Sequence, residues 1–306
     1  MSGDVVLFER NRAHLLNIAY RMLGEMSAAE DVVQEAWLRW RRAEAEEIHD
    51  PRAWLSAVTV RLSLDSLRKL RARRETYVGP WLPEPILPDD TRAFAADAPA
   101  AHAELASDLS LALLHVLERL APEERAALIL HDAFDCDYAE IAGVLGKNEA
   151  ACRKLVSRAR ERVRADRPRF TASKAAHQDL LTRFAKASIA ADTNELTALL
   201  APDAIAYTDG GGRVAAALNP IYGADKIARF FVGLRRKFYP GAALEVSATE
   251  INGSPGFFLR IDEFFTAITI ETDGERITAI YALRNPDKLQ RFLSRSASGS
   301  SPSAAR

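Results

Sequence analysis

Apolar residues in the first quarter of the chain recur every three or four positions, beginning with Val5 and continuing to Leu23. This spacing is typical of amphipathic helices that bury one face against each other. Ser27 is followed three residues later by Glu30, which is the capping-box pattern and predicts the start of a second helix. We therefore expect a helical bundle over residues 1–75.

A third helical pattern begins at Asp50, the expected cap, with Pro51 in the first turn, where a missing N–H costs nothing. Residues 76–107 then combine several prolines with an excess of acidic residues, which predicts a linker. The motif WLPEP at Trp81–Pro85 is too apolar for a pure spacer. Exposing each large apolar side chain would cost about 1.5–3 kcal/mol, so we expect this motif to dock on a surface.

Helical periodicity returns over residues 108–170. A short helical pattern ends at Gly146, and Asn148 then caps a long one. A short helix, a brief turn and a long helix are typical of a helix-turn-helix module.

The residue pattern changes over residues 171–293, where helical patterns alternate with runs rich in β-branched and aromatic residues. Turn signals at Asn252–Gly253 and Asp273–Gly274 separate these runs, which predicts antiparallel strands. The expected fold is thus multi-domain: two all-α modules, a helical bundle and a helix-turn-helix, followed by an α+β cone closed on a pocket. Residues 294–306 are expected to be a disordered tail.

Composition places limits on the chemistry. The chain has 306 residues, with 41 basic and 42 acidic side chains, so the total charge predicts no general attraction to nucleic acid. Cys136 and Cys152 make no CxxC pair, which indicates two thiols rather than a disulfide framework or a metal site. No apolar run approaches the eighteen or so residues that span a bilayer. We expect a cytoplasmic protein with no membrane segment, no metal and no cofactor.

Charge is concentrated locally, however. The run RKLRARR ends the third helical pattern, and a second dense basic set lies on the helix after Asn148. One such run is usually a solvated helix face, but two runs in separate helical modules favour nucleic-acid binding. The second run lies where a recognition helix would enter the major groove, with its N-terminal side chains on base edges and its later arginines on phosphates.

Three stretches carry a family resemblance: AEDVVQEAWLRWRR, then DPRAWLSAVTVRLSLDSLRKLRARR, then LAPEERAALILHDAFDCDYAEIAGVLGKNEAACRKLVSRARERV. In this order they resemble the successive regions of an extracytoplasmic-function (group IV) RNA polymerase sigma factor. The resemblance covers roughly Val5 to Ala165. It implies two partners, core RNA polymerase and promoter DNA, with region 2 reading the minus-ten element and region 4 the minus-thirty-five element.

The resemblance also implies residue roles. The helix containing DVVQE would bind the polymerase largest subunit through Asp31, Gln34, Glu35, Leu38 and Arg39. Promoter DNA would be bound by Arg61, Arg68, Lys69, Arg71, Arg73, Arg74, Arg153, Lys154, Ser157 and Arg158.

The third module is similar to the SnoaL-like cone. Together with WLPEP, the motifs DGGGR and NPDKL resemble a sigma-factor subgroup in which this fused domain regulates activity within the same chain. We expect DGGGR to be a turn or bulge in the sheet, where absent side chains permit close approach. The implied regulatory interface comprises Trp81, Leu82, Pro83, Glu84, Pro85, Asp209, Gly210, Gly211, Gly212, Arg213, Asn285, Pro286, Asp287, Lys288 and Leu289.

Two alternatives remain for the pocket of the third module. It could belong to an isomerase- or cyclase-like enzyme that uses acid–base groups among Tyr207, Asp209, Arg213, Asp262 and Glu263. It could instead sense a small molecule, with an apolar lining formed by Phe257, Phe258, Phe264 and Phe265. The expected protein is not an enzyme, and it is a monomer when free.

Overall fold

The computed structural model describes all of the chain except residues 1–2, 44–47, 92–108, 167–171, 243 and 298–306. Two compact units divide the chain between them. Unit 1 comprises Met1–Thr76 and Pro88–Pro168, and unit 2 comprises Tyr77–Leu87 and Arg169–Arg306. The short segment Tyr77–Leu87 thus belongs to unit 2, although the chain on both sides of it belongs to unit 1.

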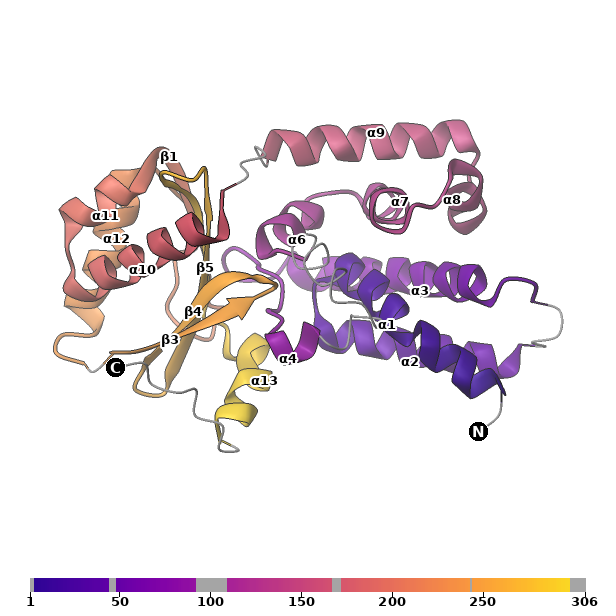
Figure 1. The fold of residues 1–306 in the computed structure, drawn as a ribbon, viewed down its shortest axis with the longest axis horizontal. Helices are drawn as coiled ribbons and strands as arrows, with labels where there is room; N and C mark the ends of the chain where they lie inside the picture. The colour runs from indigo at the N-terminus through magenta and orange to yellow at the C-terminus, as the bar shows by residue number, and fades with distance from the viewer. Residues whose placement is uncertain (1–2, 44–47, 92–108, 167–171, 243, 298–306) are drawn as a thin grey trace. The chain divides into compact units, whose positions relative to one another are not determined.

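Among its described residues, unit 1 consists of helices joined by turns and loops, with no strand (Figure 1). Its helices are α1 (Gly3–Leu23), α2 (Met26–Arg42), α3 (Pro51–Arg74), α4 (Pro88–Thr91), α6 (Leu111–Glu118), α7 (Pro122–Phe134), α8 (Tyr138–Leu145) and α9 (Glu149–Asp166). The first three pack around fully buried side chains such as Leu15, Ile18 and Leu55, which confirms the predicted helical bundle.

The helix starts agree only in part with the sequence predictions. Asp50 caps α3 as expected, because its Oδ1 accepts a hydrogen bond of 3.0 Å from the backbone N–H of Ala53. The capping box predicted at Ser27 is wrong. Helix α2 already begins at Met26, so Ser27 lies inside the helix and Glu25 precedes it without a side-chain cap.

The helix-turn-helix prediction is confirmed. Helix α8 ends at Gly146, which adopts a left-handed φ of 64°. Asn148 then accepts a hydrogen bond of 2.8 Å from the backbone N–H of Ala151, which caps the first turn of α9. These two residues set the turn between the helices.

Unit 2 is built on a six-stranded sheet with the order β2-β1-β6-β5-β4-β3. Its elements are α10 (Lys174–Ala190), α11 (Thr193–Leu199), β1 (Leu200–Asp209), β2 (Ile221–Tyr222), α12 (Ala224–Phe238), β3 (Leu244–Ile251), β4 (Ser254–Ile261), β5 (Phe264–Thr272), β6 (Ile277–Leu283) and α13 (Pro286–Ala297). Strands β1 and β6 are parallel, and the other neighbouring pairs are antiparallel.

Helices cover both faces of this sheet. Phe184 of α10 and Ile227 of α12 share one buried core with Ile268 of β5. On the opposite face the ring of Phe258 lies 4.4 Å from the ring of Phe292 in α13. The predicted α+β architecture is confirmed.

The expected boundaries shift in two places. Helix α13 continues to Ala297, four residues into the predicted tail that starts at Ser294, and residues 298–306 lie outside the described part. The predicted linker contains the docked segment Tyr77–Leu87 and the short helix α4, whereas its residues 92–107 are not described.

Candidate functional site

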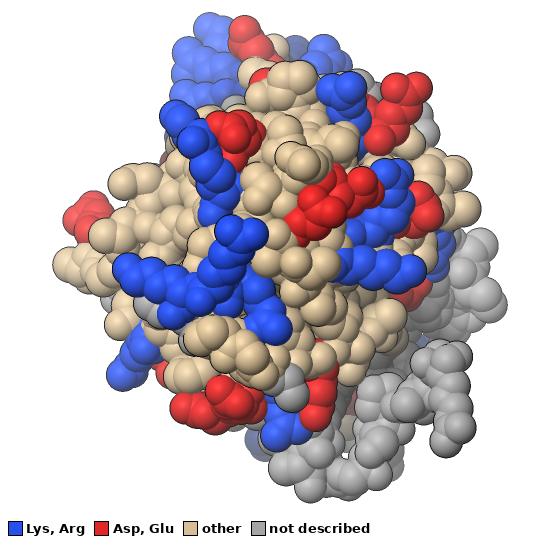
Figure 2. All heavy atoms as spheres, turned by 90° about the vertical axis from the view of Figure 1, so that its left-hand side faces the viewer, with Lys and Arg blue, Asp and Glu red and all other residues tan. Residues whose placement is uncertain are grey.

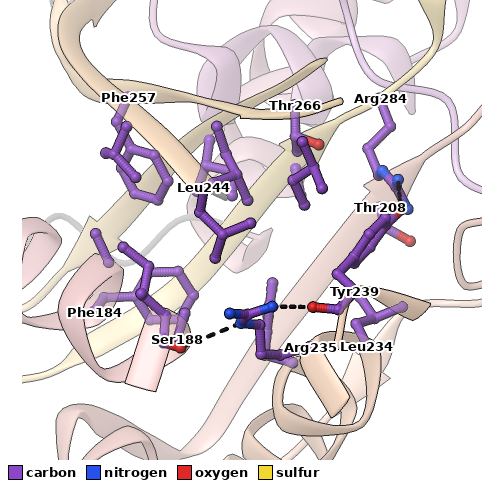
Figure 3. Close-up of a pocket in the computed structure, with 18 of the residues that line it drawn as sticks. Phe184, Ser188, Thr208, Leu234, Arg235, Tyr239, Leu244, Phe257, Thr266 and Arg284 are labelled. Atoms are coloured by element: carbon purple, nitrogen blue, oxygen red, sulfur yellow. Dashed lines mark hydrogen bonds between the residues drawn. The ribbon is translucent and has the colours of Figure 1, made fainter. Parts of the chain in front are cut away.

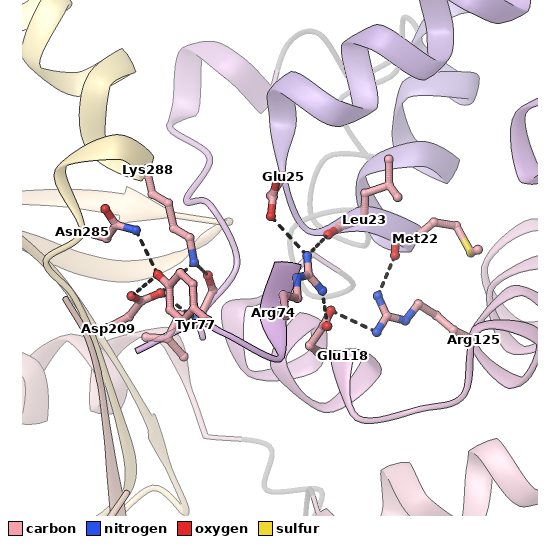
Figure 4. Close-up of polar contacts among 11 residues, drawn as sticks. Met22, Leu23, Glu25, Arg74, Tyr77, Glu118, Arg125, Asp209, Asn285 and Lys288 are labelled. Atoms are coloured by element: carbon pink, nitrogen blue, oxygen red, sulfur yellow. Dashed lines mark hydrogen bonds and ion pairs between the residues drawn. The ribbon is translucent and has the colours of Figure 1, made fainter. Parts of the chain in front are cut away.

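The three motifs singled out in the sequence meet in unit 2 around Asp209, the last residue of β1 (Figure 4). This side chain is fully buried. Its carboxylate accepts hydrogen bonds from the Leu82 N–H at 2.9 Å, the Tyr77 hydroxyl at 2.5 Å and the Lys288 ammonium at 2.7 Å. A single carboxylate therefore joins WLPEP, DGGGR and NPDKL.

Lys288 of α13 binds the backbone carbonyl of Leu82, the residue whose N–H binds Asp209. Its Nζ donates to the Leu82 carbonyl at 2.5 Å, and it lies 4.2 Å from the ring centre of Trp81 and 4.9 Å from that of Tyr77. Its side chain is only 9% exposed. A buried ammonium of this kind is stable only with a charged partner, and here it has both a carboxylate and two aromatic faces.

Backbone and amide groups hold these charges in place. The Asp209 carbonyl accepts from the N–H groups of Arg284 and Asn285, at 2.7 and 2.9 Å. The Asn285 side chain donates to the Tyr77 hydroxyl at 2.9 Å. We call Asp209, Asn285 and Lys288 the clamp, and Tyr77–Leu87 the docked segment.

The far end of the docked segment is held by an amide. Asn252 exchanges two hydrogen bonds with Ile86, accepting from its N–H at 2.9 Å and donating to its carbonyl at 2.8 Å. Glu84 lies 3.6 Å from the guanidinium of Arg291 in α13. Leu82, Pro83 and the remaining residues to Ile86 are all buried.

The glycine motif forms a turn directly after β1. Gly211 and Gly212 have φ of 59° and 70°, which favours glycine. A Cβ on Gly211 would lie 2.3 Å from Nδ2 of Asn285, and one on Gly210 would lie 2.3 Å from the Val214 carbonyl oxygen. The missing side chains thus give Asn285 room to reach Tyr77.

The other predicted interface residues lie around this centre. Leu289 is buried, and Pro286 is half-buried at the start of α13. Arg213 and Asp287 are exposed and form an ion pair at 3.3 Å. They form the solvent-facing rim of the site.

The predicted polymerase-binding residues lie on one side of α2. Asp31, Gln34, Leu38 and Arg39 are exposed, and the half-buried Glu35 pairs with Arg39 at 3.2 Å. The other side of α2 packs into the bundle through Val32, Val33, Ala36 and Trp40.

The predicted DNA-binding residues of α9 are likewise exposed on one side: Arg153, Lys154, Ser157 and Arg158. Cys152, Val156 and Ala159 are buried on the other side. Arg153 pairs with Glu149 at 2.9 Å, and its guanidinium lies 5.2 Å from the ring centre of Tyr138. Both contacts are at the surface, so a stronger anionic partner can replace them.

The basic residues of α3 do not form one set. Arg68 and Lys69 are exposed, and the side chains of Arg71 and Arg73 lie outside the described residues. Arg74 is different, because its side chain is only 11% exposed and pairs with Glu25 and Glu118. It holds helices together, so we remove it from the candidate DNA contacts.

Arg61 has an unexpected partner. Although exposed, its guanidinium donates to the backbone carbonyls of Gly143 and Val144 in α8, at 2.9 and 3.1 Å. Carbonyls at the end of a helix carry partial negative charge, which an arginine complements. The residue expected to read the minus-ten element thus binds the helix-turn-helix.

A cavity of unit 2 lies between the sheet and helices α10 and α12 (Figure 3). Of the four phenylalanines predicted to line it, only Phe257 does. Phe258 points to the α13 face, Phe264 is 37% exposed, and Phe265 lies beneath Arg260. A period of two explains Phe258 and Phe265, since neighbouring strand residues face opposite sides. Phe264 pairs with the lining residue Ile261 but is the first residue of β5, where it is exposed.

The two thiols are free, as predicted. Burial, together with the carboxylates of Glu140, Asp137 and Asp135, raises the pKa of Cys136 to about 11. Burial also raises the pKa of Cys152. Both thiols therefore stay protonated near neutral pH. Within the described ranges, no group of three or more metal-binding side chains gathers.

Comparison with known proteins identifies the family. The Sigma-70 region 2 family matches residues 7–74, and the Sigma-70, region 4 family matches residues 110–163. The ECF RNA polymerase sigma factor SigJ of Mycobacterium tuberculosis is 40% identical over 296 residues, which is 93% of each chain. This chain is an ECF sigma factor. Its recognition from three sequence stretches is confirmed.

Other relatives agree. The probable ECF RNA polymerase sigma factor SigI of Mycobacterium tuberculosis is 31% identical over 91% of this chain and 92% of its own. The crystal structure of Mycobacterium tuberculosis SigJ superposes with a TM-score of 0.73 at 37% identity, covering 94% of this chain and 98% of that one. The similarity therefore includes the C-terminal sheet domain, which supports its SnoaL-like assignment.

Family membership settles the general function. This sigma factor binds core RNA polymerase and directs promoter recognition through regions 2 and 4. The relatives are sigma factors, which are not enzymes. The acid–base groups predicted for the isomerase or cyclase alternative do not line the cavity: Tyr207, Asp209, Arg213, Asp262 and Glu263. No helix in the described part of the sigma factor is long and apolar enough to cross a membrane.

The surface of the sheet domain differs from that of α9. Basic and acidic side chains both lie on the face that carries α10 to α12 (Figure 2). Arg183 pairs there with Glu195 at 2.8 Å, and Arg229 pairs with Asp225. Such mixed charge offers phosphates little net attraction.

Three residues that support the clamp or hold the docked segment were not predicted from the sequence. Tyr77 lies just before WLPEP and gave no periodic signal, and Asn252 was interpreted only as a hairpin turn residue. Arg284 stands one position before NPDKL. Nearness to WLPEP and to NPDKL was the available signal for Tyr77 and Arg284, whereas Asn252 lies beside none of the three motifs.

Proposed function

We propose that the sheet domain restrains this sigma factor by holding the docked segment, and so acts as a built-in regulator of promoter recognition. The observation that carries the proposal is the buried pair of Asp209 and Lys288, which binds both the N–H and the carbonyl of Leu82. Backbone hydrogen bonds that do not depend on side-chain identity, together with one ion pair, bind the docked segment in a defined and reversible way.

Binding of the docked segment affects regions 2 and 4 because of where the segment lies in the chain. Region 2 ends at residue 74 and region 4 begins at residue 110, so the docked segment is part of the only covalent connection between them. A folded domain seated on that connection limits the arrangements that the two regions can reach. The polymerase must compete with the clamp for the segment.

We propose the following roles for the exposed residues. Core polymerase is bound by α2 through Asp31, Gln34, Glu35, Leu38 and Arg39. Promoter DNA is bound by Arg61, Arg68, Lys69, Arg71, Arg73, Arg153, Lys154, Ser157 and Arg158, with Arg153 on a base edge. The free protein is a monomer, and the cavity of unit 2 takes a small molecule.

Transcription from a cognate promoter with purified core polymerase tests the restraint. We expect Lys288→Met to raise output about fivefold or more, because breaking a buried ion pair costs roughly 3–5 kcal/mol and shifts the docking equilibrium toward release. Lys174→Met is the matched control, since Lys174 is 73% exposed and pairs with Glu250 on the surface. Unchanged or lower output from Lys288→Met would contradict the restraint.

Two deletions test the same idea without relying on one side chain. Ending the chain just before Asn285 removes Lys288 and α13, and ending it near residue 170 removes the sheet. Both chains should exceed the full-length protein in promoter output. If neither deletion changes the output, the regulatory role is wrong.

A further inference from the structure

The cavity between the sheet and helices α10 and α12 has a volume of about 80 Å³ and is open to solvent. Most of its wall is hydrocarbon, with Phe184, Phe230, Phe231, Leu234 and Phe257 among its lining residues. This volume is far below the range of roughly 300–1,000 Å³ that is typical of drug-sized ligands. An occupant must therefore be compact and largely apolar.

One wall of this apolar cavity is cationic. Figure 3 shows Arg284, Tyr239 and Arg235 along it. Arg284 is only 9% exposed, and it donates to the Tyr239 hydroxyl at 2.7 Å and to the Ala215 carbonyl. Arg235 donates to the backbone carbonyls of Tyr239 and, at 3.4 Å, Ile189.

All of these acceptors are neutral. Across the described residues, no carboxylate lies within ion-pair distance of Arg284 or Arg235, and no Asp, Glu or His lines the cavity. A guanidinium cannot lose its proton, so its buried charge persists at every accessible pH. Buried charges in proteins are normally paired, and this one is satisfied by hydrogen bonds alone.

One polar group on the lining lacks a hydrogen-bond partner within the described part of the chain. The Ser188 hydroxyl oxygen is buried and has no hydrogen-bond partner among the described residues. Buried hydroxyls normally find a partner. Its presence near the cationic wall adds a donor for a bound oxygen.

We propose that this cavity is a binding site for a compact apolar carboxylate. The carboxylate pairs with Arg284 as a forked, charge-assisted contact, and the hydrocarbon part lies among the phenylalanines. An anion supplies the missing charge, and an apolar body matches the lining. Neutral molecules of the same shape satisfy only the second requirement.

The site is also connected to the clamp, a link that rests on the proposed function. Thr208 and Arg284 line the cavity, and each immediately precedes a clamp residue, Asp209 and Asn285. The backbone N–H of Arg284 donates to the Asp209 carbonyl at 2.7 Å. Ligand binding thus acts on the strand ends that hold the docked segment.

Titration calorimetry on the full-length protein tests the site with defined probes. Isovalerate and benzoate are the carboxylates, and isovaleramide and benzamide are their neutral counterparts. We expect at least one carboxylate to bind at least tenfold more tightly than its amide. Arg284→Gln should weaken carboxylate binding at least tenfold, whereas the exposed Arg229→Gln should leave it unchanged.

A second variant guards against a folding defect in Arg284→Gln. Leu234→Trp fills the cavity but keeps both guanidinium groups, and it should abolish carboxylate binding while the circular dichroism spectrum stays native. The proposal is overturned if no carboxylate binds, if the amides bind equally well, or if Leu234→Trp still binds. None of these results would alter the effect of Lys288→Met on transcription, so the two proposals fail separately.

Discussion

Two buried cations of the sheet domain, Lys288 and Arg284, differ in how their charge is balanced. Lys288 is matched by Asp209 and two aromatic rings, so its charge holds a protein segment. Arg284 directly follows β6 and lines the cavity, and its side chain donates hydrogen bonds only to neutral acceptors. The first residue is satisfied within the chain, and the second is left able to bind an anion from outside.

A half-buried histidine, His14, gives unit 1 a pH dependence. Burial, with a smaller contribution from the charge of Arg52, lowers the pKa of His14 from 6.5 to about 4. His14 lies 2.9 Å from the Ser56 hydroxyl and accepts from Arg52, contacts that suit a neutral ring. In the unfolded chain it would take up a proton near pH 6.5, which the folded protein resists.

Stability contributed by neutral His14 is therefore full above pH 6.5 and is lost as the pH falls from 6.5 to 4. We expect the free energy of unfolding to drop by about 2–3 kcal/mol over that window. His14→Gln should remove most of this slope, and the exposed His49→Gln should keep it. Urea unfolding at several pH values measures it, and an equal slope in His14→Gln would rule out this origin.

Local patterns were enough to predict the elements. The stretch PEERAALILHDAF corresponds to α7 in full, and Gly146 with Asn148 set the helix-turn-helix turn. These features depend on residues within a few positions of each other. The prediction at Ser27 was wrong because α2 begins one residue earlier, at the buried Met26.

The clamp is harder to read because its partners are far apart in sequence. Leu82 and Asp209 are separated by 127 positions, and Tyr77 and Asn285 by 208. The sequence indicated that WLPEP and DGGGR were unusual, through a tryptophan-containing apolar stretch in a linker and a run of three glycines. It did not indicate which atoms pair, because backbone groups such as the Leu82 N–H leave no trace in periodicity.

The turn after β1 makes a prediction at the scale of one element. Gly211→Ala places a Cβ against the Asn285 amide and strains a positive φ, so we expect unit 2 to lose about 1–3 kcal/mol. Gly233→Ala is the control, because a Cβ at this position of α12 meets nothing within 4 Å. We expect this variant to raise the free energy of unfolding by about 0.5–1 kcal/mol. Thermal unfolding compares them. Equal stability of the two variants would show that the turn tolerates a side chain.

At the scale of the whole sigma factor, unit 1 holds regions 2 and 4 together. Arg125 of α7 is 2% exposed, donates to the Met22 carbonyl at 2.6 Å and pairs with Glu118, which also binds Arg74 (Figure 4). Arg61 adds its contact with α8. We expect the contact between Arg61 and α8 to break when regions 2 and 4 bind separate promoter elements.

Opening unit 1 and releasing the docked segment are expected to occur together, because the segment lies on the chain between the two regions. Linkage then requires that whatever favours the polymerase-bound state weakens the clamp by the same factor. The Leu82 N–H reports the clamp directly, since it donates to Asp209. We expect amide hydrogen exchange in residues 77–87 of the free protein to be slow, and to accelerate about tenfold or more when core polymerase is added.

Lys288→Met supplies the matching variant for this exchange experiment. Without the ammonium, Asp209 is left buried and uncompensated, so the segment should exchange rapidly before any polymerase is present. Addition of polymerase should then change little, while Lys174→Met should behave as the unmodified chain. If polymerase binds without accelerating exchange in residues 77–87, the segment stays clamped in the active complex. The sheet domain would then be a fixed part of the promoter-bound sigma factor rather than its restraint.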